Sequence, residues 1–348
     1  MVEPMNHLFE PYAIRDVTLR NRSVMAPMCQ YSAKNDGHAT PWHQVHLGSR
    51  AVGGVGLILV EATAVEPRGR ISTGDLGLWN DTQIDPLRSI CAFCETQGAV
   101  IGVQLAHAGR KAGTSHQGHW KDESVAPSAV PFATNWRIPH ELSTSEIADV
   151  VGSFVAAARR SIEAGFRVLE LHGAHGYLIS SFTSPLANRR TDAYGGDIHG
   201  RARFAVEVAS SVRAVMPNGM PLLMRLSGSD LDPTGNSVED MAVVAKMVHE
   251  VGVDIIHVSA GGNSPTGPVG RTNMVELAAH IRQAACVPTI GVGDIRTAEQ
   301  ADDVIRSGKA DLVALGRELL RNPYWPLAAA RALDKDMEYP QQYLGARD

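Results

Sequence analysis

Short apolar runs alternate along nearly the whole chain with longer segments whose apolar residues recur every three or four positions. The short runs predict buried strands, and the longer segments predict amphipathic helices. Strands are expected at Ser23–Met28, Gly56–Ala64, Val100–Ala106, Val168–His172, Leu222–Leu226, Asp254–Ser259, Val287–Gly291 and Asp311–Leu315.

Capping signals mark where three of the helices begin. Ser143–Glu146 and Thr297–Gln300 have the Ser/Thr-x-x-Glu/Gln pattern of a capping box, and Ser237–Asp240 is a weaker version of it. A glycine follows each of the three segments where a helix of ordinary length would end. Helices therefore separate consecutive strands in this part of the chain.

Eight strands that alternate with helices imply parallel pairing, because each return crossing carries a helix. A chain of 348 residues fits one α/β domain with the (β/α)8 TIM-barrel fold and insertions. A doubly wound sheet is the alternative, but no domain break is evident, which favours a closed barrel. We expect a single domain over residues 1–348 with a C-terminal tail at about 334–348.

The longest irregular stretch, Gly109–Leu142, follows the third strand. A loop of this length in a compact domain is usually functional. In a barrel it would form an extended loop or cap over the carboxyl ends of the strands. The alternatives are an exposed loop without a function or a contact between subunits.

The stretch His172–Leu178 emerges where the fourth strand gives way to a glycine-broken loop. Imidazoles such as His172 and His175 can donate hydrogen bonds to an oxygen that gains negative charge. The phenol of Tyr177 can deliver a proton. These three residues are therefore the candidate catalytic residues. A buried, hydrogen-bonded pair of histidines with a packing tyrosine is the alternative.

Glycines end the seventh and eighth strands, at Thr289–Asp294 and Leu315–Glu318. Glycine lets backbone N–H groups approach a ligand closely, and a helix start that carries an arginine suits a phosphate. TIM barrels often bind phosphate at these two loops. No G-x-G-x-x-G follows a strand, which indicates a mononucleotide or sugar phosphate rather than a Rossmann-bound dinucleotide. The alternative is that these glycines only form ordinary turns between a strand and the next helix and bind no phosphate.

The composition limits which binding partners and which cellular location can be expected. A net charge of −5 and the lack of a basic run longer than two residues argue against nucleic acid. No apolar run is long enough to span a bilayer, so no membrane partner is expected. Four cysteines and no evident signal peptide indicate a cytoplasmic location. Cys91 and Cys94 share a C-x-x-C spacing but have no second pair, so helix packing is favoured over a metal site.

Several motifs occur in one order along the chain, namely Leu8–Tyr12, Arg20–Arg22, Ala26–Tyr31, Trp42–His46, Val60–Val65, Gln104–Lys111, His172–Leu178, Asn188–Gly196 and Leu315–Arg317. Through them the chain resembles the Old Yellow Enzyme family of flavin-dependent ene-reductases, in its thermophilic-like branch. The resemblance covers about residues 8–343. It implies a TIM barrel that binds FMN non-covalently at the carboxyl ends of its strands and uses NAD(P)H as reductant.

The resemblance also implies roles for residues that bind the cofactor. Arg225 would lie near flavin N1 and O2, where a cation suits the negative charge of reduced flavin. Cys29 would lie close to a flavin carbonyl and tune redox behaviour, with a buried packing thiol as the alternative. The full expected cofactor set is Ala26, Pro27, Met28, Cys29, Ala62, Gln104, Arg225, Gly293, Gly316 and Arg317.

The implied substrate is a small activated alkene, such as an α,β-unsaturated carbonyl compound. His172 and His175 would bind its carbonyl oxygen, hydride would reach the β-carbon from FMN, and Tyr177 would give or relay a proton to the α-carbon. Tyr31 would face the substrate. Arg347 would reach the active site of a neighbouring subunit in a homodimer or homotetramer, although its spacing after Tyr343 departs from the family pattern.

The physiological alkene and the choice between NADH and NADPH stay open. The segment Asn263–Thr272, rich in glycine and proline, is a candidate for shaping substrate choice.

Three rival functions remain at this point. A metal-dependent barrel hydrolase would use His43, His46, His172 and His175 as ligands, but the first two fall in an expected helix. Another FMN-barrel dehydrogenase, of the dihydroorotate type, would need a catalytic base in place of the histidine pair and tyrosine. A non-catalytic binder of a phosphate ligand would leave Tyr177 and Cys29 unexplained.

Overall fold

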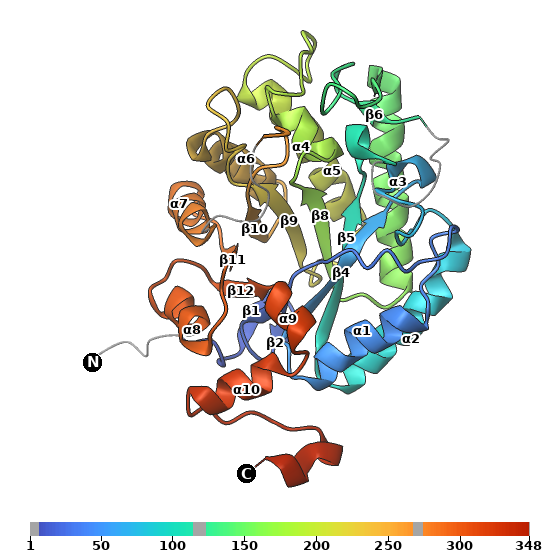
Figure 1. The fold of residues 1–348 in the computed structure, drawn as a ribbon. Helices are drawn as coiled ribbons and strands as arrows, with labels where there is room; N and C mark the ends of the chain where they lie inside the picture. Colours follow the sequence, from blue (N-terminus) through green and yellow to red (C-terminus); the bar gives the residue numbers. More distant parts are fainter. Residues whose placement is uncertain (1–6, 114–122, 267–273, 348) are drawn as a thin grey trace.

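The computed structural model describes residues 7–113, 123–266 and 274–347. Eight parallel strands form a closed barrel, in which the last strand pairs with the first (Figure 1). In barrel order they are β3 (Ser23–Met25), β4 (Leu57–Ala64), β5 (Val100–Ala106), β8 (Val168–Gly173), β9 (Leu222–Ser227), β10 (Ile255–Ser259), β11 (Thr289–Val292) and β12 (Leu312–Leu315). The closed ring confirms the predicted TIM barrel, and the doubly wound alternative was wrong.

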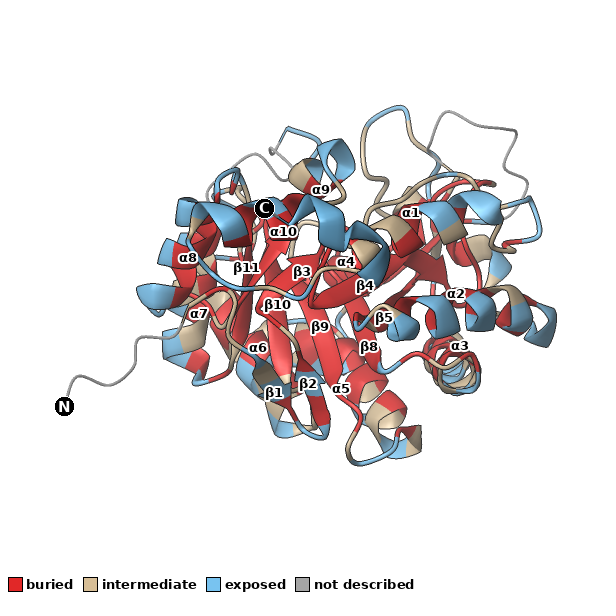
Figure 2. Cartoon of the chain, turned by 90° about the horizontal axis from the view of Figure 1, so that it is seen from below, coloured by how far each residue is buried: buried red, intermediate tan, exposed pale blue. Residues whose placement is uncertain are grey.

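Helices surround this barrel, with their buried faces toward the strands and their exposed faces outward (Figure 2). The capping boxes at Ser143, Ser237 and Thr297 are present as predicted. The helices are α1 (Pro41–Val52), α2 (Ile84–Thr96), α3 (Thr144–Glu163), α4 (Leu178–Thr183), α5 (Ile198–Val215), α6 (Val238–Glu250), α7 (Val275–Ala285), α8 (Ala298–Arg306), α9 (Arg317–Arg321) and α10 (Trp325–Ala332). Short 3-10 turns are η1 (Pro67–Gly69), η2 (Asp81–Gln83), η3 (Gly109–Lys111) and η4 (Gln341–Ala346).

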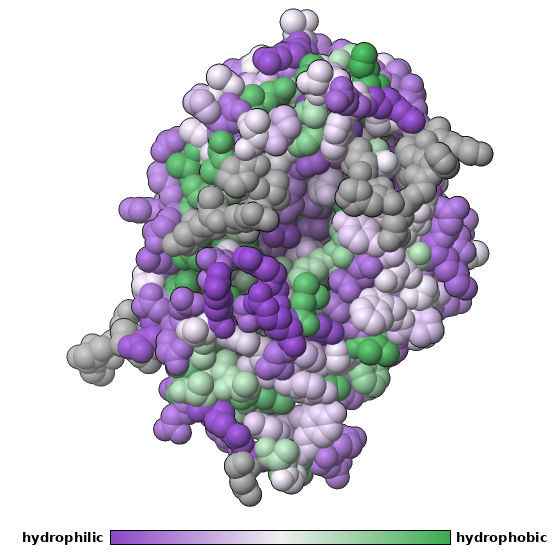
Figure 3. Space-filling view, in the orientation of Figure 1, coloured by the Kyte–Doolittle hydropathy of each residue, from purple (hydrophilic) through white to green (hydrophobic). Residues whose placement is uncertain are grey.

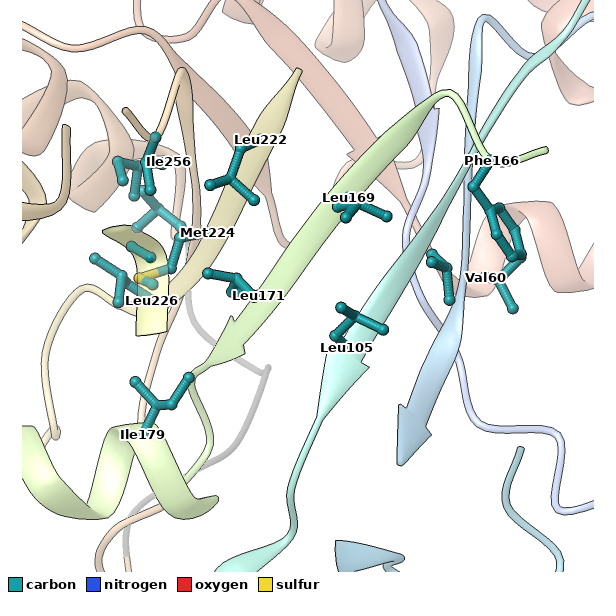
Figure 4. Packing of buried hydrophobic residues seen from close by; sticks show 14 of the residues in the cluster. Val60, Leu105, Phe166, Leu169, Leu171, Ile179, Leu222, Met224, Leu226 and Ile256 are labelled. Carbon is teal, nitrogen blue, oxygen red and sulfur yellow. The ribbon is translucent and has the colours of Figure 1, made fainter. Parts of the chain in front are cut away.

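Alternation along the strands separates the outside of the barrel from its inside. On β8, Leu169 and Leu171 belong to the large cluster that packs toward the helices, together with Leu222 and Met224 of β9 (Figure 4). Val168 belongs instead to a second cluster with Leu57, Leu223, Ile255, Ile290 and Leu312, which fills the barrel near the amino ends of its strands.

Polar residues occupy the same inward positions closer to the carboxyl ends. Because strand side chains alternate with a period of two, the inward residues of β8 after Val168 are Glu170 and His172. The inward residues of β9 after Leu223 are Arg225 and Ser227, and those of β10 after Ile255 are His257 and Ser259. The barrel therefore has an apolar floor and a polar upper part.

The loop after the third predicted strand carries structure of its own. It contains η3 and a two-stranded sheet of β6 (Val125–Ala126) and β7 (His140–Glu141), while residues 114–122 lie outside the description. Gly109 of this loop lies against the start of α4, which follows β8, so the loop lies over the carboxyl ends of the strands as predicted.

The amino end of the barrel carries a hairpin that was not predicted. It consists of β1 (Tyr12–Ile14) and β2 (Val17–Leu19), and its Ile14, Val17 and Leu19 extend the apolar floor. Each of these strands has three residues that are not all buried, so neither forms the continuous apolar run by which the equally short β3 could be recognised.

The C-terminal tail lies at this same amino end. A groove there is formed between residues 338–342 of the tail and Arg20 and Gly98, which precede β3 and β5. Arg347 forms an ion pair with Asp336. None of the described helices has the length and apolar character needed to cross a membrane.

Candidate active site

A cavity of about 370 Å³ opens at the carboxyl ends of the strands. Its size falls in the range of small-molecule sites. In the space-filling view the surface is hollowed near the centre, with hydrophilic and hydrophobic residues around the hollow (Figure 3). The predicted residues on its wall are Ala26, Pro27, Met28, His175, Arg225, Gly293, Gly316 and Arg317.

His172 lies near the end of β8 on the inner side of the barrel, and it is buried. The backbone N–H of Ala174 donates to its Nδ1 at 3.4 Å, which places the ring proton on Nε2. Burial lowers the pKa of His172 well below its ordinary value, and the charge of Arg225 lowers it further. His172 is therefore a neutral imidazole whose Nε2 is a hydrogen-bond donor.

His175 occupies a left-handed backbone conformation, with φ of +63°. Such a conformation is uncommon for a residue with a side chain and persists only where the surroundings hold it. Here Ser227 Oγ accepts from its backbone N–H at 3.0 Å, and Ser259 Oγ lies 2.6 Å from its Nε2. The His175 ring is perpendicular to that of His172, with 5.2 Å between centroids.

The turn that carries His175 packs directly against another loop. Gly176 has φ of +73°, and a Cβ there would lie 2.1 Å from the carbonyl oxygen of Gly262. Only glycine allows this approach. Burial, followed by the charges of Arg225 and His172, lowers the pKa of His175 well below its ordinary value, so this ring is also neutral.

These two neutral histidines make stability depend on pH. In the unfolded chain they take up protons near pH 6.5, whereas in the folded protein they resist protonation. The free energy of unfolding is therefore expected to fall as the pH drops from about 7 to 5, by up to about 1.4 kcal/mol per pH unit for each histidine. Urea unfolding at several pH values in this range, at a fixed FMN concentration, measures this free energy. A His172→Gln variant with the same pH dependence as the wild type would contradict the assignment.

Lys111 holds the same turn from the other side. Its Nζ donates to the carbonyl oxygens of His175 at 2.8 Å and Gly262 at 3.2 Å. The amine also lies 5.3 Å from the centroid of the Tyr177 ring, within cation–π range. Burial, followed by the charge of Arg110, lowers the pKa of Lys111 to about 8.

Lys111→Met is expected to lower kcat/KM for an alkene by roughly 10-fold or more. A hydrogen bond from a charged group is worth about 1.5–3 kcal/mol, and here the two bonds fix the position of His175. Steady-state kinetics on the FMN-loaded protein checks this, with the exposed Lys246→Met on α6 as control. Equal kcat/KM values for the two variants would contradict the role of Lys111 in positioning His175.

Tyr177 lies beside His172, with 5.0 Å between ring centroids. It packs with Cys29 against a small cluster that includes Ala62. Burial raises the pKa of Tyr177 well above its ordinary value, so the phenol keeps its proton at neutral pH. Burial, and then the carboxylate of Glu61, raises the pKa of Cys29, which is therefore a thiol rather than a thiolate.

A β-bulge on β4 positions Ala62 and the chain that carries Cys29. The register between β4 and β5 shifts between Val60 and Ala62, which leaves Ala62 opposite Gln104. Between them, the carboxylate of Glu61 accepts from the backbone N–H of Gln30 at 2.9 Å and lies 3.2 Å from Nε2 of His43.

His43 and His46 lie on α1, as the helix prediction required. Within residues 7–113, 123–266 and 274–347, no three His, Cys, Asp or Glu side chains form a group that could hold a metal ion. Cys91 and Cys94 are buried in the core on α2, which confirms their packing role.

Arg225 provides the test of whether these residues fit FMN. It is buried on the cavity wall, and its Nε has no hydrogen-bond partner in the part of the chain that the structure describes. A buried donor without a partner is costly and marks the position of a ligand acceptor. Burial lowers the pKa of Arg225, but a guanidinium still keeps its charge at neutral pH. It suits the electron-rich pyrimidine edge of a flavin.

The opposite part of the cavity suits the phosphate. Arg296, Arg317 and Arg321 lie on its wall, and Asp294 lies 2.9 Å from Arg296 and 3.5 Å from Arg317. Gly293 has φ of +114°, a conformation that favours glycine. The cationic groups at both ends, with apolar residues such as Met28 between them, fit FMN.

The predicted residues that do not lie on the cavity wall are Cys29, Ala62, Gln104, His172, Tyr177, Tyr31 and Arg347. His172 and Tyr177 lie next to His175, which is on the wall. Gln104 is buried deeper in the barrel, where its Nε2 donates to Glu170 at 2.7 Å. Tyr31 is 42% exposed and lies near enough to Tyr177 to influence its ionisation. Arg347 lies in the tail at the other end of the barrel, so its role in a neighbouring subunit stays a prediction. The segment Asn263–Thr272 is described only as far as residue 266.

Sequence reasoning missed Lys111, Ser227, Ser259, Arg296 and Arg321. Ser259 ends a predicted strand and Lys111 ends a quoted motif, so both could have been singled out by position. Arg296 lies in the loop after β11 and Arg321 is the last residue of α9, and neither position carries such a signal.

Comparisons with known proteins agree with this geometry. Residues 7–336 match the model of the NADH:flavin oxidoreductase / NADH oxidase family. An NADPH dehydrogenase from Geobacillus sp. (strain WCH70) is 48% identical over 338 residues, or 97% of each chain. Morphinone reductase matches with a TM-score of 0.83 and 28% identity, covering 98% of this chain and 93% of that one.

An Old Yellow Enzyme homologue from Zymomonas mobilis has a TM-score of 0.80 and 26% identity, covering 96% of this chain and 94% of that one.

Proposed function

This chain belongs to the NADH:flavin oxidoreductase / NADH oxidase family, which includes Old Yellow Enzyme homologues, and we propose from this premise a finer function. The proposed function is the reduction of the carbon–carbon double bond of activated alkenes. The protein is an NAD(P)H-dependent flavin oxidoreductase that binds FMN non-covalently. The assignment of alkene reduction depends on one observation. Two neutral imidazoles and a protonated phenol converge beside the cavity that Arg225 lines.

When bound, FMN supplies hydride that it has received from NAD(P)H. The residues of this chain would do the rest. Nε2–H of His172 and the ring of His175 would hold the carbonyl oxygen of the alkene and stabilise the negative charge that grows on it. Because the low pKa of each ring keeps it neutral, each histidine would donate a hydrogen bond while it keeps its own proton. Tyr177 would protonate the α-carbon.

The same groups argue against a dihydroorotate-type dehydrogenase, which removes a proton from carbon with a base. The lowered pKa values of His172 and His175 make both rings weak bases, and the raised pKa of Tyr177 keeps it protonated. All three are suited to donate hydrogen bonds or protons.

Arg225, Gln104 and the residues Gly293, Gly316 and Arg317 would hold FMN. Arg317→Ala is expected to raise the Kd for FMN by roughly 10–100-fold, because a hydrogen bond to a charged group is worth about 1.5–3 kcal/mol. Quenching of FMN fluorescence measures the Kd. The exposed Arg306→Ala on α8 is the control, and equal affinities for FMN in both variants would contradict the phosphate assignment.

A two-part experiment tests the proposed function. The purified protein is expected to show the visible absorption of FMN, and to oxidise NADH or NADPH faster when enones, maleimides or nitroalkenes are added. Product analysis should show the saturated compound. A flavin-loaded protein that reduces none of a broad alkene panel with either nicotinamide would refute ene-reduction and leave only the coarser oxidoreductase function.

A further inference from the structure

We propose that Glu170 and His257 form a positioning pair beneath the cofactor, which orients the amide of Gln104 and lowers the reduction potential of FMN by opposing the charge of Arg225. The inference rests on the proposed placement of FMN at this end of the barrel. Glu170 and His257 are fully buried and neither lies on the cavity wall, so the pair would act through Gln104 and Arg225 rather than as catalytic residues.

Four polar residues lie side by side on consecutive strands of the barrel. Gln104 of β5 is paired in register with Glu170 of β8, and Arg225 of β9 is paired with His257 of β10. Glu170 and His257 are fully buried, and Gln104 is 2% exposed. A buried polar chain of this kind is costly to build unless its members are satisfied, so its presence invites a functional explanation.

Glu170 dictates which way the amide of Gln104 faces. Gln104 Nε2 donates to Glu170 Oε1 at 2.7 Å. A carboxylate can only accept hydrogen bonds, so the reversed amide would place two acceptors against each other. The amide oxygen of Gln104 is thereby left as an acceptor, which is the group that the N–H of a flavin pyrimidine ring requires.

The second oxygen of Glu170 fixes the state of His257. Nδ1 of His257 lies 2.8 Å from Glu170 Oε2 and must donate to it. Nε2 of His257 is buried and has no hydrogen-bond partner among the residues that the structure describes. Burial, followed by the charge of Arg225, lowers the pKa of His257, so the ring is neutral. Because both oxygens of Glu170 accept hydrogen bonds, from Gln104 and His257, the pair carries one net negative charge, on this carboxylate.

Burial lowers the pKa of Arg225, and the nearby carboxylate of Glu170 acts in the opposite direction. Arg225 alone would strongly favour the extra negative charge of the reduced cofactor. Glu170 offsets part of that effect, and charges act strongly on one another where water is excluded. The pair would therefore make reduced FMN a better hydride donor than it would be beside an uncompensated arginine.

Glu170→Gln tests the inference, because it removes the charge and keeps the size of the side chain and one of its two acceptor oxygens. The midpoint potential of bound FMN is measured by equilibration with reference dyes, a readout that needs no alkene. The two-electron reduction equilibrium is expected to shift at least tenfold toward the reduced cofactor, or about 30 mV to more positive potential.

The chain offers a matched control in Glu66, whose carboxylate lies 2.7 Å from Nε2 of the buried His107. Glu66 is not among the charged groups that act on Arg225, so Glu66→Gln is expected to leave the potential unchanged. An unchanged potential in FMN-loaded Glu170→Gln would overturn the inference. An equal shift in both variants would also overturn it, since the effect would then not be specific to Arg225.

His257 provides a second route if Glu170→Gln does not fold. His257→Phe removes the donor to Glu170 and should make a proton on Glu170 more favourable, which shifts the potential in the same direction. His257→Asn retains an N–H in nearly the same place and should restore the wild-type potential. Identical potentials in both variants and the wild type would overturn the inference. A wild-type protein that takes up no FMN would instead refute the proposed site as a whole.

Discussion

Replacing His172 with alanine is expected to slow alkene reduction by roughly 10²–10³-fold while FMN stays bound. The structure places the ring proton of His172 on Nε2 and keeps the ring neutral. Removing one such donor to an oxygen that gains charge typically costs about 2.7–4 kcal/mol in the transition state. FMN should remain because His172 is absent from the residues that would hold its phosphate and pyrimidine ring.

Single-turnover reoxidation of the reduced protein by cyclohexenone measures this effect directly. His172→Asn, which keeps a donor N–H, should retain more activity than His172→Ala. His249→Ala is a suitable control, because His249 lies on α6 and bonds to the carbonyl oxygen of Val253. Wild-type turnover in His172→Ala would refute the assignment of this residue.

Replacing Tyr177 with phenylalanine is expected to slow the same reoxidation by roughly 10²–10⁴-fold, the usual effect of losing a general acid. The substitution removes the hydroxyl group alone, so the ring can still pack against the cluster that contains Ala62. Reduction by NADPH requires no proton on a substrate carbon and should stay near the wild-type rate. The two half-reactions are therefore expected to separate in this variant.

Stopped-flow absorbance can follow each half-reaction in turn. Tyr194→Phe serves as the matched control, because its hydroxyl donates to Glu207 at 2.8 Å and lies outside the cavity wall. If Tyr177→Phe were reoxidised as fast as the wild type, the proton would have to come from elsewhere. A loss of NADPH reduction as large as the loss of reoxidation would indicate general damage to the site.

The barrel could be predicted from the sequence because its signal is local. Each strand is a short apolar run between helices, and the closed architecture follows from the count and order of these units. Apart from the missed hairpin of β1 and β2, the errors lie at strand ends. The seventh strand was predicted at Val287–Gly291, but β11 is Thr289–Val292. Pro288 has no N–H to donate, so it can only accept, as it does from Ile256.

The catalytic candidates could be found for a similar reason. His172, His175 and Tyr177 lie within six residues at the end of one strand, so a single local pattern carries all three. The residues that hold them in place come from distant parts of the sequence. Ser259 meets His175 across 84 positions, and His257 meets Glu170 across 87. Only the closure of the barrel brings such pairs together, and no spacing in the sequence reveals it.

The C-terminal tail shows a different limit of prediction from sequence. Arg347 was assigned to a neighbouring active site through resemblance alone, and within one chain it pairs with Asp336. A contact between subunits has no signal in the periodicity of a single chain, and its test needs the assembled protein.

The most direct test of the whole account is an anaerobic titration of the FMN-loaded protein. Addition of NADPH is expected to bleach the visible absorption of the flavin, and an equimolar amount of cyclohexenone should then restore it and yield cyclohexanone. A protein that is bleached by NADPH but stays bleached with the enone would contradict the claim that two neutral histidines and Tyr177 hold and protonate an activated alkene at this cavity.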